Sequence, residues 1–155
     1  MIAFITSKGT LDKANSSVRK YIAQRAELLG AVRLPSNTFQ KIANTKVTTD
    51  ILFFRKYEKQ KVNEPEWIHV GMTEQGVPIN EYYLHHPDHM LGTMVFDKSM
   101  YGNEKGTSCI NDNPDFNLIG VLQQKLKEIT EQQIPISTPV SYTHLLIKRW
   151  KKQKQ

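Results

Sequence analysis

The first 54 residues alternate short apolar runs with one amphipathic segment. IAFIT at residues 2–6 is a continuous apolar and β-branched run, typical of a strand that is buried on both faces, as in a parallel sheet. Two further strands are expected at 31–34 and 47–54, separated by a polar loop. Before them, a helix is expected at about 18–29, with Gly30 as its C-terminal stop. Its apolar face would consist of Val18, Tyr21, Ile22, Ala26 and Leu29.

This order of strand, helix, strand, loop and strand is typical of the far end of a doubly wound sheet. One strand–helix–strand unit with a returning strand cannot bury both faces of its sheet. We therefore expect residues 1–58 to be the later part of a larger α/β domain whose earlier strands precede them.

Shorter elements are expected after residue 60. Two β runs, at 67–72 and 77–84, lie on either side of a turn at 74–76. A loop rich in Gly, Asn and Ser is expected at 101–112. These patterns indicate a small α+β extension over residues 59–139.

A helix is expected in the last part of that extension. Asn113 and Pro114 have the residue types of an N-cap and a first helical position. Its apolar face would consist of Leu118, Leu122, Leu126 and Ile129, and it should end before Pro135.

Composition narrows the classes of protein. A chain of 155 residues has room for one domain, or for one and part of a second. A single cysteine, Cys109, excludes a disulfide framework and fits a reducing, cytoplasmic compartment. No apolar run approaches the roughly 20 residues that a membrane span requires.

The net charge of +6 is concentrated at the C-terminus. The closing residues KRWKKQKQ hold five of the 21 basic residues, so the rest of the chain is nearly neutral. A basic tail can bind DNA through its phosphates, and it can equally be an unstructured end. PVSYTHL, at its start, resembles translated sequencing-adapter read-through. We therefore expect residues 140–155 to be a basic tail that is disordered or artefactual.

The candidate chemistry is sparse. A histidine-rich segment at residues 85–89 contains His85, His86, Asp88 and His89 and could hold a metal, although Pro87 makes a regular helix unfavourable there. Neither a GxSxG elbow nor a phosphate-binding glycine loop occurs in the sequence. The residues therefore favour neither catalysis nor metal binding by this chain.

Phe39 lies alone in a polar connector, RLPSNTFQKIANTKV, between two expected strands. A lone loop aromatic usually packs back onto the sheet. It can also stack on a planar ligand, such as a base drawn out of a duplex. Residue types alone leave both interpretations open.

The longer phrases ITSKGTLDK, VRKYIAQRAELLGAVRLP, NTF and VTTDILF occur in order over the first third of the chain. Together they resemble the C-terminal half of the catalytic domain of N6-adenine-specific DNA methyltransferases. The nearest branch is that of the large methylase–helicase proteins of phages and conjugative elements. The segment WIHVGMTEQGVPINEYYLHHPDHMLGTM is similar to the region that follows the methylase core there.

The resemblance implies a partial Rossmann-like methyltransferase sheet, followed by the α+β extension. Residues 2–6 would be its fifth strand, 31–34 its sixth, and 47–54 its inserted antiparallel seventh. The loop between the last two strands would face double-stranded DNA, with Phe39 toward the flipped adenine and with Ser36, Asn37, Lys41 and Asn44 around it. A helicase domain in the same polypeptide is a further implied partner.

The chain departs from the family by lacking both an Asn-Pro-Pro-aromatic tetrapeptide and an acidic-Gly cofactor motif. Both would lie upstream of Met1. The resemblance therefore implies S-adenosylmethionine as the cofactor of the full-length protein only. This chain alone is expected to bind no cofactor, to contain no catalytic or metal-binding residue, and to be inactive.

Two alternatives remain open. A non-catalytic α/β module could bind DNA or a protein partner, and its salt-dependent duplex binding would survive deletion of residues 140–155. A metal-dependent hydrolase could use the segment from His85 to His89, and would retain zinc that is lost on His86→Ala.

Overall fold

A computed structural model of the chain describes residues 1–98 and 106–133, with the side chains of residues 41 and 42 excepted. The expected tail at 140–155 lies outside these residues, as do residues 101–105 of the expected loop at 101–112. The fold is mixed α/β with small antiparallel sheets. In chain order its elements are β1 (Ile2–Ser7), α1 (Gly9–Asp12), α2 (Ser17–Ala23), β2 (Ala26–Leu34), α3 (Gln40–Ala43), β3 (Thr49–Lys56), η1 (Glu66–Ile68), β4 (Val70–Met72), β5 (Pro78–Asn80), α4 (Glu81–His85), η2 (Pro87–His89), β6 (Thr93–Phe96), β7 (Thr107–Ile110) and α5 (Leu118–Gln133).

The main sheet has the strand order β1-β3-β2, and β3 is antiparallel to both of its neighbours. β1 and β2 are therefore parallel to each other. Thr49, at the start of β3, lies opposite both Ser7 and Leu34, which end β1 and β2. The carboxyl ends of β1 and β2 thus meet at one end of the sheet, together with the start of β3.

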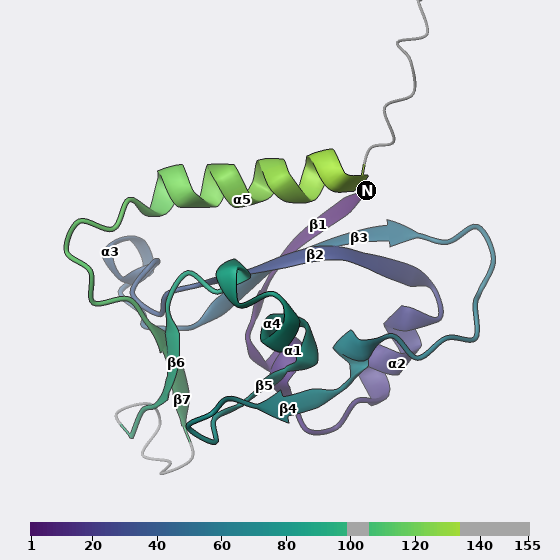
Figure 1. Ribbon diagram of the computed structural model, residues 1–155, viewed down its shortest axis with the longest axis horizontal. Helices are drawn as coiled ribbons and strands as arrows, with labels where there is room; N and C mark the ends of the chain where they lie inside the picture. Colours follow the sequence, from purple (N-terminus) through teal and green to yellow (C-terminus); the bar gives the residue numbers. More distant parts are fainter. Residues whose placement is uncertain (99–105, 134–155) are drawn as a thin grey trace, which may run out of the picture.

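Each face of this sheet packs against a different set of elements (Figure 1). The helix α5 covers one face, where Leu29, Val32 and Phe53 pack with Ile129. On the other face, apolar residues of the first 58 positions pack with Trp67, Tyr83 and others from after position 60. Residues on both sides of position 58 thus share one core. No helix among the described residues has the length and apolar character that a membrane span requires.

The prediction that residues 2–6 are buried on both faces is wrong. Ile2, Phe4 and Ile5 are 46%, 51% and 64% exposed. β1 lies at the edge of the sheet, where it pairs with β3 on one side and with no other strand of residues 1–98 and 106–133. No residue of β1 belongs to the two apolar clusters that cover the faces of the sheet, so its side chains stay exposed.

The expected helix at 18–29 ends early, at Ala23, and Gly30 lies inside β2 instead of stopping a helix. The helix ends there because the backbone from residue 24 onward forms hydrogen bonds with the segment after β3. Tyr57 N donates to Arg25 O at 2.8 Å, and Lys61 N donates to Gln24 O at 2.9 Å. A bulge at Leu29 then lets β2 continue along β3.

Two later elements also differ from expectation. The β run at 77–84 stops at Asn80, because the Asn80 side chain accepts a hydrogen bond from Tyr82 N at 2.9 Å and caps α4. The expected loop at 101–112 contains the strand β7. The turn at 74–76 is confirmed, with Gly76 at a positive φ of 77°.

The helix expected from Asn113 begins at Leu118. Asn113 Oδ1 accepts from Asp115 N in a turn, and Asn117 Oδ1 accepts from Gly120 N at the true helix start, in each case at 3.0 Å. The apolar face is confirmed, because its four predicted residues pack in or against the cluster beneath α5.

Gly30 is required by the close approach of β2 to α5. A Cβ at this position would lie 2.8–2.9 Å from three side-chain carbons of Ile129. Gly30→Ala should therefore lower the free energy of unfolding by about 1–3 kcal/mol through overpacking. In an Ile129→Ala background, which removes those carbons, the same change should cost almost nothing. Chemical denaturation of the four proteins measures this coupling, and an equal cost in both backgrounds would contradict the contact.

Candidate functional site

The candidate nucleic-acid loop, residues 35–48, lies at the end of the sheet where β1 and β2 terminate. Phe39 precedes α3 within this loop. Its side chain is partly buried and packs against the apolar cluster beneath α5. Phe39 is thus anchored to the core, and its predicted contact with a target base stays a prediction.

The other residues predicted for this loop are spread along it. Ser36 is held at both backbone groups, since its N donates to Cys109 O at 2.8 Å and its O accepts from Val47 N at 3.0 Å. Asn37 and Asn44 are exposed, and Asn44 ends α3 with a positive φ of 48°. The side chain of Lys41 lies outside the described structure. The loop therefore has a fixed base and exposed amide side chains.

A buried ion network lies directly behind this loop. Arg33 on β2 is fully buried and binds two carboxylates, each through two nitrogens. Its Nε and Nη2 donate to Asp50 at 2.8 and 2.9 Å, and its Nη1 and Nη2 donate to Asp12 at 2.7 and 3.0 Å. The Tyr83 ring lies 4.4 Å from the guanidinium carbon.

The charged groups of this network are buried away from solvent. Burial lowers the pKa of Arg33, but Asp50 and Asp12 raise it, so that it stays well above its ordinary value. Burial raises the pKa of Asp50, and Arg33 opposes that rise. Arg33 is therefore a permanent cation that both acids share, and because both acids are bound to it, neither is a free base for catalysis.

The sequence interpretation missed this network, although a signal was present. Arg33 and Asp50 each interrupt an apolar strand, in GAVRLP and TTDILFF. Charged residues are almost never buried unless they are paired. A charge inside an apolar strand therefore predicts a partner, but it does not identify one. No pattern of residues indicates that Asp12, 21 positions from Arg33, joins them.

The histidine-rich segment does not converge as a unit. His85 pairs with exposed Glu66 at 2.9 Å, and His86 stacks on His89 with ring centres 5.2 Å apart. His89 Nδ1 lies 2.7 Å from the Tyr82 hydroxyl, which also accepts from Ala31 N at 3.1 Å. Burial lowers the pKa of His89. Its ring is therefore neutral at pH 7 and ties η2 to α4 and β2.

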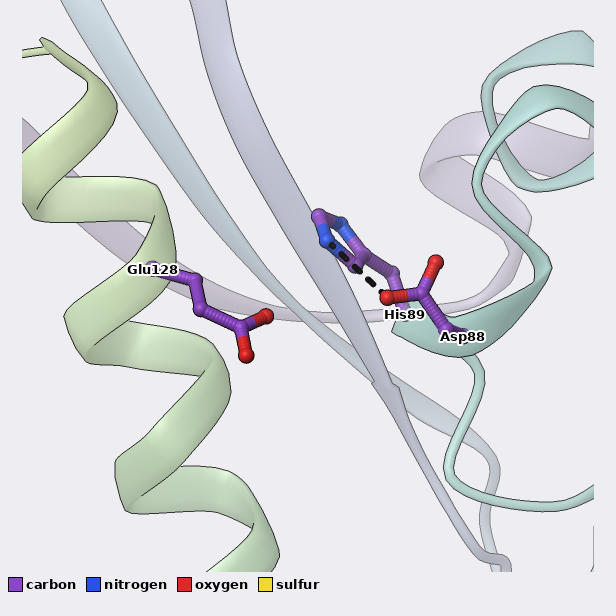
Figure 2. A group of neighbouring side chains, drawn as sticks. All are labelled: Asp88, His89 and Glu128. Carbon is purple, nitrogen blue, oxygen red and sulfur yellow. Dashed lines mark ion pairs between the residues drawn. The ribbon is translucent and has the colours of Figure 1, made fainter.

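Asp88 and His89 on η2 nevertheless approach Glu128 on α5 (Figure 2), with ligand atoms that lie within 4.8 Å of one another. Lys125 bridges the two acids, because its Nζ lies 2.7 Å from Asp88 and 3.0 Å from Glu128. Its hydrogen bond with Asp88 lowers the pKa of that acid and raises the pKa of Lys125. A protein ammonium thus already supplies the positive charge that a metal would bring.

The lone thiol is not an activated nucleophile. Cys109 on β7 is fully buried, and burial raises its pKa to about 12. The thiol is therefore protonated at neutral pH and does not react as a thiolate.

Comparisons with models of known protein families, with curated proteins and with solved structures found no match to the chain. The family resemblance described above therefore stays a prediction, and the function has to be argued from the sequence and the geometry.

The ion network predicts a large stability effect. Arg33→Met should lower the free energy of unfolding by about 3–5 kcal/mol, because it leaves Asp12 and Asp50 without a counter-charge. Arg55→Met is the matched control, since it removes an exposed pair with Glu27, 48% and 42% exposed, and should cost about 0–1 kcal/mol. Urea denaturation measures both variants. Similar losses of unfolding free energy in the two variants would contradict a special role of the buried network in stability.

Lys125 predicts a conditional metal site. Lys125→Ala should leave Asp88, His89 and Glu128 without an ammonium, so that the variant retains about one zinc per chain after dialysis. Lys127→Ala, on the same helix but 73% exposed, should retain none. Atomic absorption measures the metal, and adding His89→Ala should abolish it. Equal zinc in the unchanged chain and in Lys125→Ala would contradict the role of Lys125.

Proposed function

We propose that this chain is the late-strand part of an N6-adenine DNA methyltransferase catalytic domain, and that it supplies the DNA-facing strands and the target-base loop. In this proposal double-stranded DNA is the substrate. S-adenosylmethionine and the catalytic tetrapeptide belong to preceding residues of the full-length protein, and the chain alone is inactive.

The uncovered strand β1 is the observation that carries the proposal. Its apolar residues Ile2, Phe4 and Ile5 are exposed on both faces of the strand. Its outer edge pairs with no strand of residues 1–98 and 106–133. An exposed apolar edge strand invites association with another strand. A sheet that continues beyond β1, with helices over it, would satisfy this strand.

The strand order gives independent support. The resemblance implies that residues 47–54 are an inserted antiparallel strand. The order β1-β3-β2, with β3 antiparallel to both neighbours, agrees with that implication. The loop that carries Phe39 connects β2 to β3 and lies at the carboxyl ends of β1 and β2, where ligands bind in open α/β sheets.

Among the described residues, the two acids at this end of the sheet do not fit as ligands of a cofactor. Asp12 and Asp50 are the acids placed behind this end of the sheet, and both are bound by Arg33. Neither is free to accept the hydroxyl groups of a nucleoside. In the proposal, the cofactor is therefore bound by the preceding part of the domain.

The test is to extend the reading frame of the locus upstream and to assay the extended protein for adenine methylation of duplex DNA. The added sequence should encode an Asn-Pro-Pro-aromatic tetrapeptide and a cofactor motif. Phe39→Leu in that protein keeps apolar packing but removes the stacking ring, so methylation should fall roughly 10- to 100-fold while the melting temperature is kept. Phe96→Leu, at a residue that is 50% exposed on β6, is the control.

Two outcomes would contradict the proposal. An in-frame stop upstream, with neither motif nearby, would remove the methyltransferase assignment. Full activity of Phe39→Leu would leave the assignment but would remove the target-base role of Phe39.

A further inference from the structure

A pocket of about 570 Å³ lies where β1 ends and α1 and α2 begin. This volume is within the roughly 300–1,000 Å³ range of small-molecule sites, so the pocket can admit a group as large as a nucleotide unit. Its polar lining includes Ser7, Lys8, Thr10, Lys13, Asn15 and Arg19. Neither the resemblance nor the sequence motifs assign a role to these residues.

The lining of the pocket carries net positive charge. Lys8, Lys13 and Arg19 line it, and neither lysine forms an ion pair within the described part of the chain. Asp12 is the acid among the lining residues; both of its oxygens are bound by Arg33, and its charge also acts on Arg19. A pocket lined by three cations and one acid has an excess of positive charge and attracts anions.

Arg19 shows that the charge is built into the fold. Its side chain is buried, with only 2% of the residue exposed, and its Nε donates to Ile68 O at 2.7 Å while Nη1 reaches Thr10 O at 3.4 Å. Nη2 has no hydrogen-bond partner among the described residues. Buried guanidinium groups are normally paired with a carboxylate or another anion. Nη2 is itself covered by protein, and Asp12 acts on Arg19 electrostatically without a hydrogen bond to it. Arg19 thus contributes charge beneath the pocket and no direct hydrogen bond from Nη2.

The pocket adjoins the candidate DNA loop. Lys8 N donates to Thr48 O at 3.0 Å, and Ser7 lies opposite Thr49 in the sheet. The loop after β1 and the end of the loop at 35–48 are therefore in direct contact. A polynucleotide that presents a base at one of these loops can place a backbone phosphate at the other.

We propose that this pocket is a phosphate-binding site, in which Lys8 and Lys13 hold a backbone phosphate of the DNA strand and the buried charge of Arg19 lies behind them. Lysine ammonium groups and hydroxyl donors such as Ser7 and Thr10 suit the three-dimensional oxygen array of a phosphate. The anion site follows from the pocket itself. Its assignment to DNA rests on the proposed function.

The experiment uses the full chain with two probes, sodium phosphate and a short DNA duplex. Lys8→Gln/Lys13→Gln removes two charges from the pocket. Lys56→Gln/Lys59→Gln removes two exposed charges from the opposite end of the sheet and is the matched control. Both variants keep the basic C-terminal residues, so any difference between them reports the pocket. Thermal melts should show that both remain folded.

The pocket variant should lose roughly tenfold in phosphate affinity by calorimetry, and the control should be unchanged. For the duplex, the slope of log K against log salt should fall by about 1 in the pocket variant, as expected for one lost phosphate contact. Equal phosphate affinity in the pocket variant and the control would overturn the site. Loss of phosphate binding without any change for the duplex would support the site but assign it to free phosphate.

The outcome is independent of the methylation assay. A phosphate site that is confirmed while the upstream sequence lacks the methyltransferase motifs would separate this inference from the proposed function. If methylation depends on Phe39 but the pocket variant binds phosphate and DNA as the control does, the proposed function would stand and the phosphate site would be overturned.

Discussion

The rest of the structure depends on the neutralisation of Arg33. Its guanidinium lies inside the protein and holds β3 through Asp50 and α1 through Asp12. A buried ion network of this kind adds little net stability, but it penalises any arrangement in which one partner is missing. Register and loop position are thereby fixed together: β2 and β3 have to pair so that Arg33 faces Asp50, and the chain after β1 has to turn so that Asp12 arrives beside them.

The network extends through Asn80 into the second half of the chain. Asp12 Oδ1 also accepts from Asn80 N at 3.0 Å, and Asn80 Nδ2 donates to Leu11 O and Trp67 O, each at 2.8 Å. The same side chain caps α4 through Tyr82 N. One buried amide thus joins α1, η1, β5 and α4 to the sheet. The extension after residue 58 is therefore part of the scaffold that positions the loop after β1.

Local signals in the sequence predicted local structure well. The turn at Gly76 and the apolar face of α5 follow from residue types and spacing over a few positions, and both are confirmed. Elements whose conformation depends on distant partners were misread. Ala26 and Leu29 have helical spacing to Ile22, yet pairing with β3 draws them into β2. The convergence of Asp12 on Arg33 and the ammonium between Asp88 and Glu128 likewise require contacts that the pattern of residues does not contain.

The topology of the sheet determines where two features lie: the edge of β1 that pairs with no strand of the described residues, and the end of the sheet that holds the Phe39 loop. Because β3 runs antiparallel between β1 and β2, the loops that follow those two strands meet at one end of the sheet, and Lys8 N and Thr48 O join them. The unpaired edge of β1 runs along the side of the sheet instead, perpendicular to that end. A further strand could therefore pair with β1 along its length while the phosphate pocket and the Phe39 loop stay at its end. Completing the sheet and binding a polynucleotide would use different surfaces of the same strand, and the fold can satisfy both.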